Sequence, residues 1–513
     1  MRDNDGKKAF TIVELIIVIA VIAILLAVLI PTFAGFLKNS KSSSDLQLVH
    51  HMEKALQAAS QFEIPDDVID VSGILIDEGI GKDAVSRPTV EGHRFYWHSK
   101  HNVIVMILEE EGKDPVLVYP EDNEQLKNDL SADMAAGLLF NVLDGYEYTI
   151  KKVANTEDLK AAMADKTKIV LTTNIDLTES IECADNITVI LDLKGHTLSS
   201  TNIAIEVKTG AVLNIKNGST DEVRLNALES GNLNIKKISA RNTLWYTIEN
   251  TGGIITVEDS TIYSSESAIC NNSGTLTLSN TKVDAEMIAI TNVGTLTVNN
   301  STIASHMAEN TAAIAVLNEG GSVNVIDSEL KAPSECVNNR SGTVDISGSS
   351  LDSDNVAIAN TDEMIITDTE ISGRLGIHNA EGNMTINNVN ASAEYVCIQN
   401  DTDGTVTVNG GVFFGGSLAV INNGYDMTLT NAQMEAGNGC INNRGEGDID
   451  IFGGTYTCKG AKAMFSTTDK GSTFSFKDGV VIVTGAINPF TVGTQVSGEE
   501  NSDYKIVYTV TED

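Results

Sequence analysis

Three histidines, His93, His98 and His101, stand close together in the chain at strand-like spacing. Imidazole nitrogens are frequent ligands of zinc, and a protein site completes the set with cysteine or carboxylate groups. We identify no nearby cysteine or acidic residue that would complete a set around these histidines. The sequence therefore predicts no metal site, and nothing else in it indicates a cofactor.

Sugar-cleaving chemistry would need clustered carboxylates, often with Ca²⁺, and a lysine or arginine base on one face. Trp245 and Tyr246 could form a small carbohydrate patch, but ordinary packing is the simpler interpretation. We predict no catalytic residue and expect that the chain is not an enzyme. Several aspartates lie close together in the sequence, in a pattern typical of solvated turns: Asp352, Asp354, Asp362 and Asp368.

The N-terminus places a single carboxylate inside an apolar run. Residues 10–30 are apolar except for Thr11 and Glu14, and they follow a polar start that ends in KKA. A helix of this length measures about 31 Å at 1.5 Å per residue, which is enough to span a bilayer. A carboxylate inside such a helix costs roughly 2.5–3.5 kcal/mol, so Glu14 needs a compensating cation. A plain membrane anchor and a cleaved secretory signal are the competing interpretations.

Phe10, Glu14 and Pro31 stand in a register that resembles the N-terminus of type IV pilins and pseudopilins, where a proline is common at the position of Pro31. The resemblance implies that a prepilin peptidase cuts between Ala9 and Phe10 and methylates the new amine. It also implies that Glu14 pairs with the Phe10 amine of a neighbouring pilin subunit during assembly. The residue before the cut is usually glycine, so processing after Ala9 is expected to be slower or absent.

The charge of the chain constrains its partners and location. There are 34 basic and 70 acidic residues, for a net charge of −36. Such a chain should avoid nucleic acid and anionic membrane faces, and it suits a secreted surface that stays soluble. With residues 1–9 as the leader and 10–30 as the only membrane anchor, everything after residue 40 is expected outside the cytoplasm, on the cell surface or in a pilus.

A small folded unit is expected after the long helix. The helix, residues 10–62, should stop at Pro65. Residues 93–108 and 115–120 are rich in strand-forming side chains and flank a polar turn, which predicts a strand pair. Because the second half of the helix packs against a small sheet in pilins, we expect residues 63–150 to form a small α+β pilin-like head.

From about residue 187 onward, a unit of about 21 residues recurs. From Thr247 to Asn443 the units start with a small residue, then Ile or Val, any residue and Asn, and a second alternating strand such as GTLTL follows in most of them. Stacked turn asparagines can hydrogen-bond to one another and tolerate tight-turn backbone angles. The pattern therefore predicts a structural ladder formed by Asn250, Asn271, Asn292, Asn318, Asn339, Asn360, Asn379, Asn400, Asn422 and Asn443.

Three short strands in about 21 residues make one coil of a parallel β-solenoid. The pattern resembles the right-handed β-helix of the pectate-lyase-like superfamily, and the handedness of parallel crossovers favours the same sense. We expect about 13 coils over residues 187–485, an N-terminal cap over 151–186 and a C-terminal cap or tail over 486–513, because terminal strands are open edges. The predicted fold class is a transmembrane α-helix and a small α+β head, followed by this mainly-β solenoid.

The repeat also bears on the cysteines. Cys336, Cys397 and Cys440 occupy the small position, which is alanine in most coils. They are two or three coils apart, roughly 10–14 Å, whereas a disulfide needs Cα atoms within about 7 Å. We therefore expect free thiols that act as small apolar fillers. Strict alternation of inward and outward side chains would place this small position on the outer face of the solenoid. Either the small residues line a groove there, or the turn reverses the alternation so that they point inward.

One outward column can be followed through the repeat, namely the residue before each ladder asparagine. An enzyme that used this face would be expected to carry carboxylates on neighbouring coils. No two neighbouring coils do so, because the column contains Glu249, Cys270, Thr291, Leu317, Asn338, Ala359, His378, Gln399, Ile421 and Asn442.

Together these features predict a type IV pilin-like surface subunit, in a minor or tip position, whose solenoid arm serves display or adhesion toward a surface glycan or protein. Two alternatives stay open. One is a membrane-anchored polysaccharide lyase or hydrolase that uses the solenoid face. The other is a pseudopilin of a type II-like secretion system.

Overall fold

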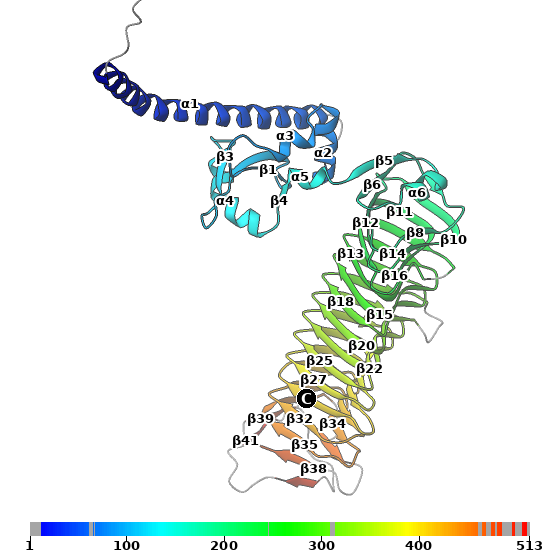
Figure 1. Cartoon of the computed structure of the whole chain (residues 1–513). Helices are drawn as coiled ribbons and strands as arrows, with labels where there is room; N and C mark the ends of the chain where they lie inside the picture. Colours follow the sequence, from blue (N-terminus) through cyan, green and yellow to red (C-terminus); the bar gives the residue numbers. More distant parts are fainter. Residues whose placement is uncertain are drawn as a thin grey trace, which may run out of the picture. The chain divides into compact units, whose positions relative to one another are not determined.

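The computed structural model describes residues 12–60, 65, 67–244, 246–307, 313–459, 464–467, 473–477, 480–484, 495–497 and 505–509. The chain divides into two compact units, Met1–Ile150 and Lys151–Asp513, and each contains its own hydrophobic core (Figure 1).

The first unit begins with one long helix, α1 (Ile12–Ser60), where a helix was predicted over residues 10–62. Its backbone stays helical through Pro31. The C-terminal part of α1 buries Val49, Met52 and Leu56 in a core that it shares with the sheet of the head. The same helix that starts in the apolar N-terminal run therefore also packs against the head.

A buried carboxylate ties α1 to the head. Asp45 is 2% exposed and accepts hydrogen bonds from Thr89 N at 2.7 Å and Val90 N at 2.9 Å, and its Oδ2 lies 2.8 Å from His93 Nδ1. Burial raises the pKa of the Asp45 carboxyl, but the hydrogen bonds from Thr89, Val90 and His93 together outweigh it and hold the pKa below its ordinary value. The carboxylate form therefore stabilises this contact.

The head contains a four-stranded antiparallel sheet in the order β3-β2-β1-β4. Its strands are β1 (His93–His98), β2 (Val103–Leu108), β3 (Val116–Tyr119) and β4 (Leu139–Asn141). The accompanying helices are α2 (Val68–Asp77), α3 (Lys82–Ser86), α4 (Glu124–Ala135) and α5 (Val142–Gly145).

The prediction of one strand over residues 93–108 is wrong, because this run is a hairpin. β1 and β2 pair antiparallel along their full length, and β3 joins the far edge of β2. The chain turns through the polar residues Ser99–Asn102, and Asn102 adopts a φ of 51°, a left-handed conformation that asparagine tolerates. The unit is an α+β domain, and its likeness to a pilin head stays a prediction.

The second unit is a parallel β-solenoid, which confirms the mainly-β coil predicted from the repeat. One coil consists of β24 (Val356–Asn360), β25 (Glu363–Thr367) and the start of β26 (Glu370–Asn379). Each strand pairs in parallel with its equivalent on the next coil, and Figure 1 shows the strands stacked along the unit. The right-handed sense of the coil stays a prediction.

The remaining strands of this unit are short segments separated by turns. The first of them are β5 (Thr149–Val153), β6 (Thr167–Leu171), β7 (Ile175–Asp176), β8 (Ile181–Cys183), β9 (Thr188–Asp192), β10 (Thr197–Val207), β11 (Val212–Ala227), β12 (Asn232–Asn242), β13 (Ile248–Glu258), β14 (Thr261–Ser264), β15 (Ser267–Ser279), β16 (Lys282–Ala285), β17 (Ile288–Asn292), β18 (Thr295–Asn299), β19 (Thr302–Ser305), β20 (Ile314–Ile326), β21 (Glu329–Ala332), β22 (Glu335–Ser347) and β23 (Ser350–Ser353). Those after β26 are β27 (Asn383–Asn387), β28 (Asn390–Asn400), β29 (Thr405–Asn409), β30 (Val412–Gly415), β31 (Leu418–Asn422), β32 (Met427–Thr430), β33 (Gln433–Ala436), β34 (Gly439–Asn443), β35 (Ile449–Phe452), β36 (Gly454–Cys458), β37 (Phe465–Thr467), β38 (Thr473–Phe476), β39 (Val480–Thr484), β40 (Gln495–Ser497) and β41 (Lys505–Thr509).

The coil extends further in both directions than the predicted limits of 187 and 485. Strands β6 and β8, in the segment predicted as the N-terminal cap, already pair in parallel with β9 and β10. At the other end β41 pairs in parallel with β39. The solenoid consequently has about 15 turns rather than about 13. The helix α6 (Thr156–Ala162) precedes the first coil and buries Leu159 and Ala162 in the solenoid core.

The predicted asparagines form a continuous ladder inside the turns. From Asn250 to Asn443, each Nδ2 donates to the Oδ1 of the next asparagine at 2.6–3.0 Å. Most of these amides also donate to a carbonyl of their own turn, as Asn339 does to Gly342 O. All ten side chains are at most 1% exposed, so the ladder satisfies polar groups that would otherwise be buried without partners.

The small position lies inside the coil. Ala357 and Cys336 are 0% exposed, and so are the neighbouring Ile358 and Val337, so two consecutive side chains point inward. The parity therefore flips within the strand, between Ala357 and Ile358 of β24, and the column lines no groove. The six cysteines are all free and buried. Burial raises the pKa of the Cys397 thiol to about 12, which keeps it protonated at neutral pH.

Candidate functional site

The processing residues predicted at the N-terminus lie at the edge of what the structure describes. Ala9 and Phe10 are outside the described residues, whereas Glu14 and Pro31 lie within the helix α1. Within the described parts of the chain, no helix has both the length and the apolar character of a membrane span. The membrane crossing over residues 10–30 therefore stays a prediction.

The column before the ladder asparagines runs in register from coil to coil, as in the pairing of Ala359 with His378 and of His378 with Gln399. Two of its members bind one turn aspartate: His378 Nε2 lies 2.8 Å from Asp401 Oδ2, and Gln399 Nε2 donates to the same oxygen at 2.7 Å. Burial raises the pKa of Asp401, but the bonds from Asn423, Gln399 and His378 hold it below its ordinary value. Together these side chains form a hydrogen-bonded turn.

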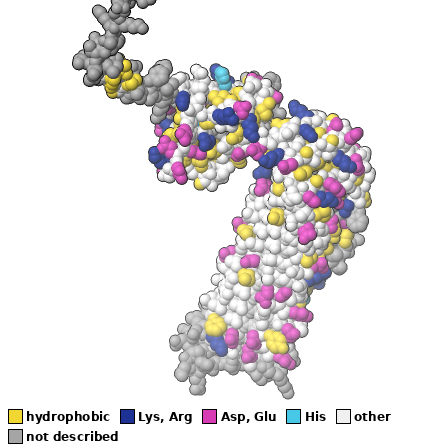
Figure 2. Space-filling view, in the orientation of Figure 1, with side chains coloured by type: hydrophobic (Ala, Val, Ile, Leu, Met, Phe, Trp, Pro, Cys, Tyr) yellow, Lys and Arg dark blue, Asp and Glu magenta, His cyan; other side chains and the backbone are white. Residues whose placement is uncertain are grey.

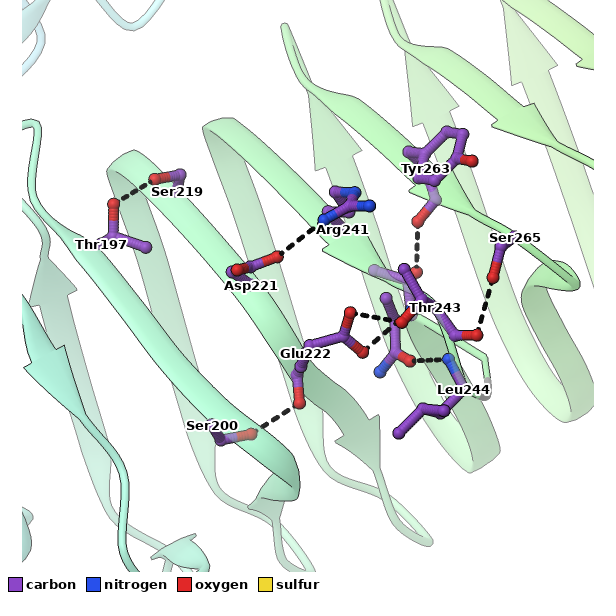
Figure 3. Close-up of polar contacts among 12 residues, drawn as sticks. Thr197, Ser200, Ser219, Asp221, Glu222, Arg241, Thr243, Leu244, Tyr263 and Ser265 are labelled. Carbon is purple, nitrogen blue, oxygen red and sulfur yellow. Dashed lines mark hydrogen bonds and ion pairs between the residues drawn. The ribbon is translucent and has the colours of Figure 1, made fainter.

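A second outward column has a more varied chemistry. Asp221, Arg241, Tyr263 and Asp284 occupy equivalent positions on β11, β12, β14 and β16. Figure 3 shows three of them in line, with Arg241 Nη1 3.5 Å from Asp221 Oδ1. The Arg241 guanidinium also lies 5.7 Å from the centre of the Tyr263 ring. The column thus combines carboxylates, a planar donor and an aromatic ring on a rigid sheet.

Asp284 is the most heavily paired carboxylate of this column. Its Oδ1 lies 2.6 Å from His306 Nε2, and its Oδ2 lies 2.8 Å from Lys282 Nζ. Asp221 and Asp284 are three coils apart, roughly 14 Å at the spacing of parallel strands. Paired carboxylates of glycoside hydrolases stand at most about 9.5 Å apart. These two groups are therefore too far apart to act on one glycosidic bond as such a pair.

Nearby turn residues in Figure 3 have structural partners. Glu222 accepts hydrogen bonds from both the N–H and the hydroxyl of Thr243, at 2.9 and 2.6 Å, and Ser200 donates to the Glu222 carbonyl at 2.5 Å. These bonds hold the turn that precedes the exposed side chain of Leu244. Trp245, predicted as half of an aromatic patch, lies outside the described residues.

Two exposed aromatic rings lie on neighbouring coils further along the solenoid. Tyr395 is 52% exposed, with the Arg374 guanidinium 4.8 Å from its ring centre. Phe414 is 37% exposed, with Lys459 Nζ 5.6 Å from its ring centre. We call these four side chains the aromatic patch, although the two rings stand at different positions of their coils, because Phe414 is in register with Ser392 rather than with Tyr395. Sequence analysis missed it, although alternation around the buried Phe413 would have placed Phe414 outside.

Asp354, Asp362 and Asp368 lie in or beside turns as predicted, but the prediction is wrong for Asp352, which lies within strand β23. Asp352 Oδ1 accepts from Ser372 Oγ at 2.6 Å, and Asp362 Oδ2 accepts from Gly342 N at 2.7 Å. Asp368 Oδ1 accepts from Asn388 Nδ2 at 2.6 Å, and Asp354 follows β23 directly. Figure 2 shows acidic side chains scattered over the visible face of the solenoid rather than gathered in one patch.

The three histidines of the head separate into two groups. His93 contacts Asp45 of α1, whereas His98 and His101 lie beside Asp133 of α4. The expectation that no acidic residue would complete the histidine cluster is therefore wrong. Asp133 is 35 residues from His98 in the sequence, and only the fold brings the two together.

Comparisons with known proteins add one match in sequence. Residues 4–30 match the family model described as "Prokaryotic N-terminal methylation motif". No curated protein matches the chain. The chain is thus a parallel β-solenoid protein that carries a prepilin-type N-terminal motif.

Two solved structures are similar to this chain. The catalytic unit of a thermostable GH87 alpha-1,3-glucanase from Streptomyces thermodiastaticus strain HF3-3 shares 11% identity at a TM-score of 0.29, over 70% of this chain and 67% of that one. Tailspike protein 2 of Escherichia coli O157:H7 bacteriophage CAB120 shares 11% identity at a TM-score of 0.25, over 69% of this chain and 46% of that one. At these scores neither likeness carries an argument about function.

Proposed function

We propose that the protein is a pilin-like, membrane-anchored subunit that displays its solenoid at the cell surface. The observation that carries the proposal is the methylation motif at residues 4–30, because it leads directly into α1. The contacts of Asp45, Val49 and Met52 support it further, because they join the same helix to the head. A force on the anchor would thus be transmitted to a folded domain.

In this proposal the N-terminal residues act in assembly. Cleavage between Ala9 and Phe10 by a prepilin peptidase creates a cationic amine, and Glu14 is a suitable counter-ion on the helix of a neighbouring subunit. The apolar face of the helices then packs in the membrane or in a filament core. Since so bulky an arm would crowd every position of a thin filament, we assign the protein a minor or tip position.

The arm would serve adhesion, with the aromatic patch as the contact region for a carbohydrate. Exposed aromatic rings bind the apolar faces of sugars, and the neighbouring cations Arg374 and Lys459 provide hydrogen-bond donors. A fully folded solenoid presents such groups on rigid strands, which lowers the entropy lost on binding.

The anchor is tested by expressing the full chain in a host with a prepilin peptidase and measuring the N-terminal peptide by mass spectrometry. We expect a chain that starts at N-methylated Phe10. Glu14→Ala should be processed equally but be absent from sheared filaments, whereas the exposed Glu78→Ala should assemble normally. A chain cut after the apolar run, or never cut, would contradict the proposal.

The arm is tested by binding of the full chain to a panel of acidic and neutral polysaccharides, with and without Ca²⁺. We expect binding that falls at least tenfold in a Tyr395→Ala/Phe414→Ala variant and is unchanged in Tyr425→Ala, another exposed tyrosine. New reducing ends or unsaturated products in the same assay would favour the hydrolase or lyase instead. Loss of secreted proteins on deletion of the gene would favour a secretion pseudopilin.

A further inference from the structure

The head brings together three side chains that together form a metal-ligand set. One ring nitrogen of His98, one of His101 and one carboxylate oxygen of Asp133 all lie within 4.8 Å of one another. One pair, His98 Nε2 and Asp133 Oδ2, is 3.0 Å apart. Zinc bonds of about 2.0–2.1 Å place tetrahedral ligand atoms roughly 3.3 Å apart, so this pair already has suitable spacing.

The fold builds the cluster from two elements. His98 is the last residue of β1, and His101 follows it across the hairpin turn, where its N–H donates to the His98 carbonyl at 3.3 Å. Asp133 lies in the last turn of α4, whose end is tied to the same hairpin. Ser99 N donates to Leu138 O at 3.0 Å, and Leu138 N donates to Asp133 O at 2.9 Å. Backbone hydrogen bonds therefore position the carboxylate beside the histidines.

The histidines have unused hydrogen-bonding capacity. His98 is 1% exposed, yet its Nδ1 has no hydrogen-bond partner among the described residues, and neither has the buried Nε2 of His101. The two rings lie edge to face with centres 4.6 Å apart. His98 Nε2 already bonds Asp133, and one imidazole binds a given ion through one nitrogen only, so the unpartnered Nε2 of His101 is the nitrogen that indicates a missing ligand.

We propose that His98, His101 and Asp133 bind a divalent transition metal ion, with zinc as the best fit. Two imidazoles and one carboxylate match the mixed nitrogen and oxygen ligands of zinc, and a water molecule or a group from a partner would complete a tetrahedron. Ca²⁺ and Mg²⁺ prefer sites made of oxygen atoms alone. Lys100 Nζ lies 3.8 Å from Asp133 Oδ1, but its side chain is half exposed and can turn to solvent.

Such an ion would fasten α4 to the β1–β2 hairpin. Binding that is specific for the folded state stabilises it in proportion to the logarithm of the free metal concentration. This inference does not depend on the proposed adhesion by the solenoid.

The test uses the full chain in detergent, purified without a polyhistidine tag and treated with a chelator. Calorimetric titration with Zn²⁺ should show one site that Ca²⁺ does not fill. Co²⁺ in the same site should give visible absorption bands of a four- or five-coordinate ion. Absence of this site in the wild-type chain would overturn the proposal.

Variants identify the ligands. We expect His101→Ala, in the partly exposed turn, and Asp133→Asn, which keeps the side-chain volume, each to weaken Zn²⁺ binding roughly 100-fold and to abolish the rise in Tm with zinc. His51→Ala, an exposed histidine on α1, is the matched control and should bind as the wild type does. If one variant fails to fold, the other decides, and unchanged binding in a folded variant would overturn the proposal.

Discussion

The head and the solenoid solve the same problem, burial of polar groups, in opposite ways. In the solenoid one solution is repeated, because nine hydrogen bonds of 2.6–3.0 Å join ten asparagines in a row. In the head, a few hydrogen bonds that occur only once satisfy the buried polar groups, such as those between Asp45 and Thr89, Val90 and His93. The solenoid therefore distributes its polar contacts over many coils, whereas the head concentrates them at a few residues.

This difference predicts different sensitivity to mutation. In a solenoid each coil contacts mainly its neighbours, so stability is close to a sum of local terms. In a small α+β domain the loss of one buried network affects the whole cooperative unit. A substitution should thus open the solenoid locally but destabilise the head as a whole.

Asp45→Ala should have the largest effect. It leaves the buried His93 and the partly buried amide of Val90 without their acceptor, and we expect the free energy of unfolding of the head to fall by roughly 3 kcal/mol. Hydrogen exchange of β1 and β2, read by mass spectrometry on the full chain, measures this. The exposed neighbour Glu91→Ala should change it by less than about 0.5 kcal/mol. Equal effects of the two variants would contradict the special role of Asp45.

Asn339→Ala should have the next largest effect. Asn318 loses its acceptor and Gly342 O loses its donor, which we expect to lower the local stability by about 2 kcal/mol. Exchange should speed up in β22 and its neighbouring coils while the head is unaffected. The control is Asn409→Ala, because Asn409 bonds to Asn387 on the exposed face. Faster exchange throughout the chain would show that the stability of the solenoid is not a sum of local contributions from its coils.

Ala357→Leu tests the inward direction of the small column. Because Ala357 is fully buried within β24, the added carbon atoms should destabilise its coil by about 1–2 kcal/mol. Ala359→Leu, two positions further on, points to the other side and should be nearly neutral. Exchange rates of β24 in the two variants provide the comparison. If both variants behaved alike, the small residues would not form the buried, inward-pointing column.

The smallest effect concerns pH. The hydrogen bonds lower the pKa of Asp45 in the folded state below its unfolded value of about 3.9. The contribution of Asp45 to the stability of the fold is therefore fully present above the unfolded pKa, and it is lost as the pH falls through the folded pKa. The difference in Tm between the wild type and Asp45→Asn should therefore be constant above pH 5 and shrink toward pH 3. A difference that stays the same at pH 3 would contradict this assignment.

Much of the solenoid could be predicted because its contacts have a constant sequence separation. The asparagine ladder, the free cysteines and the parallel strands all follow from a period of about 21 residues. The limits at 187 and 485 were wrong, because β6 and β41 pair in parallel as coil strands beyond them. Exposed Phe414 was missed although the same alternation predicts it.

The head was predicted less well because its contacts occur once. The hairpin within residues 93–108 depends on a four-residue polar turn, and nothing in the local pattern distinguishes it from a long strand. The pairing of Asp45 with His93 spans 48 residues, and that of Asp133 with His98 spans 35. A contact that occurs once leaves no periodic trace in a single sequence.

The sequence by itself therefore determined the prepilin-type motif at residues 4–30 and the repetitive half of the molecule, since a repeating backbone imposes a repeating choice of side chains. Only the tertiary structure decided the inward direction of the small column, the contact of Asp45 with the head and the gathering of His98, His101 and Asp133. The physical reason is that these depend on how chain segments distant in sequence pack, and that packing is set by the whole core rather than by any local pattern.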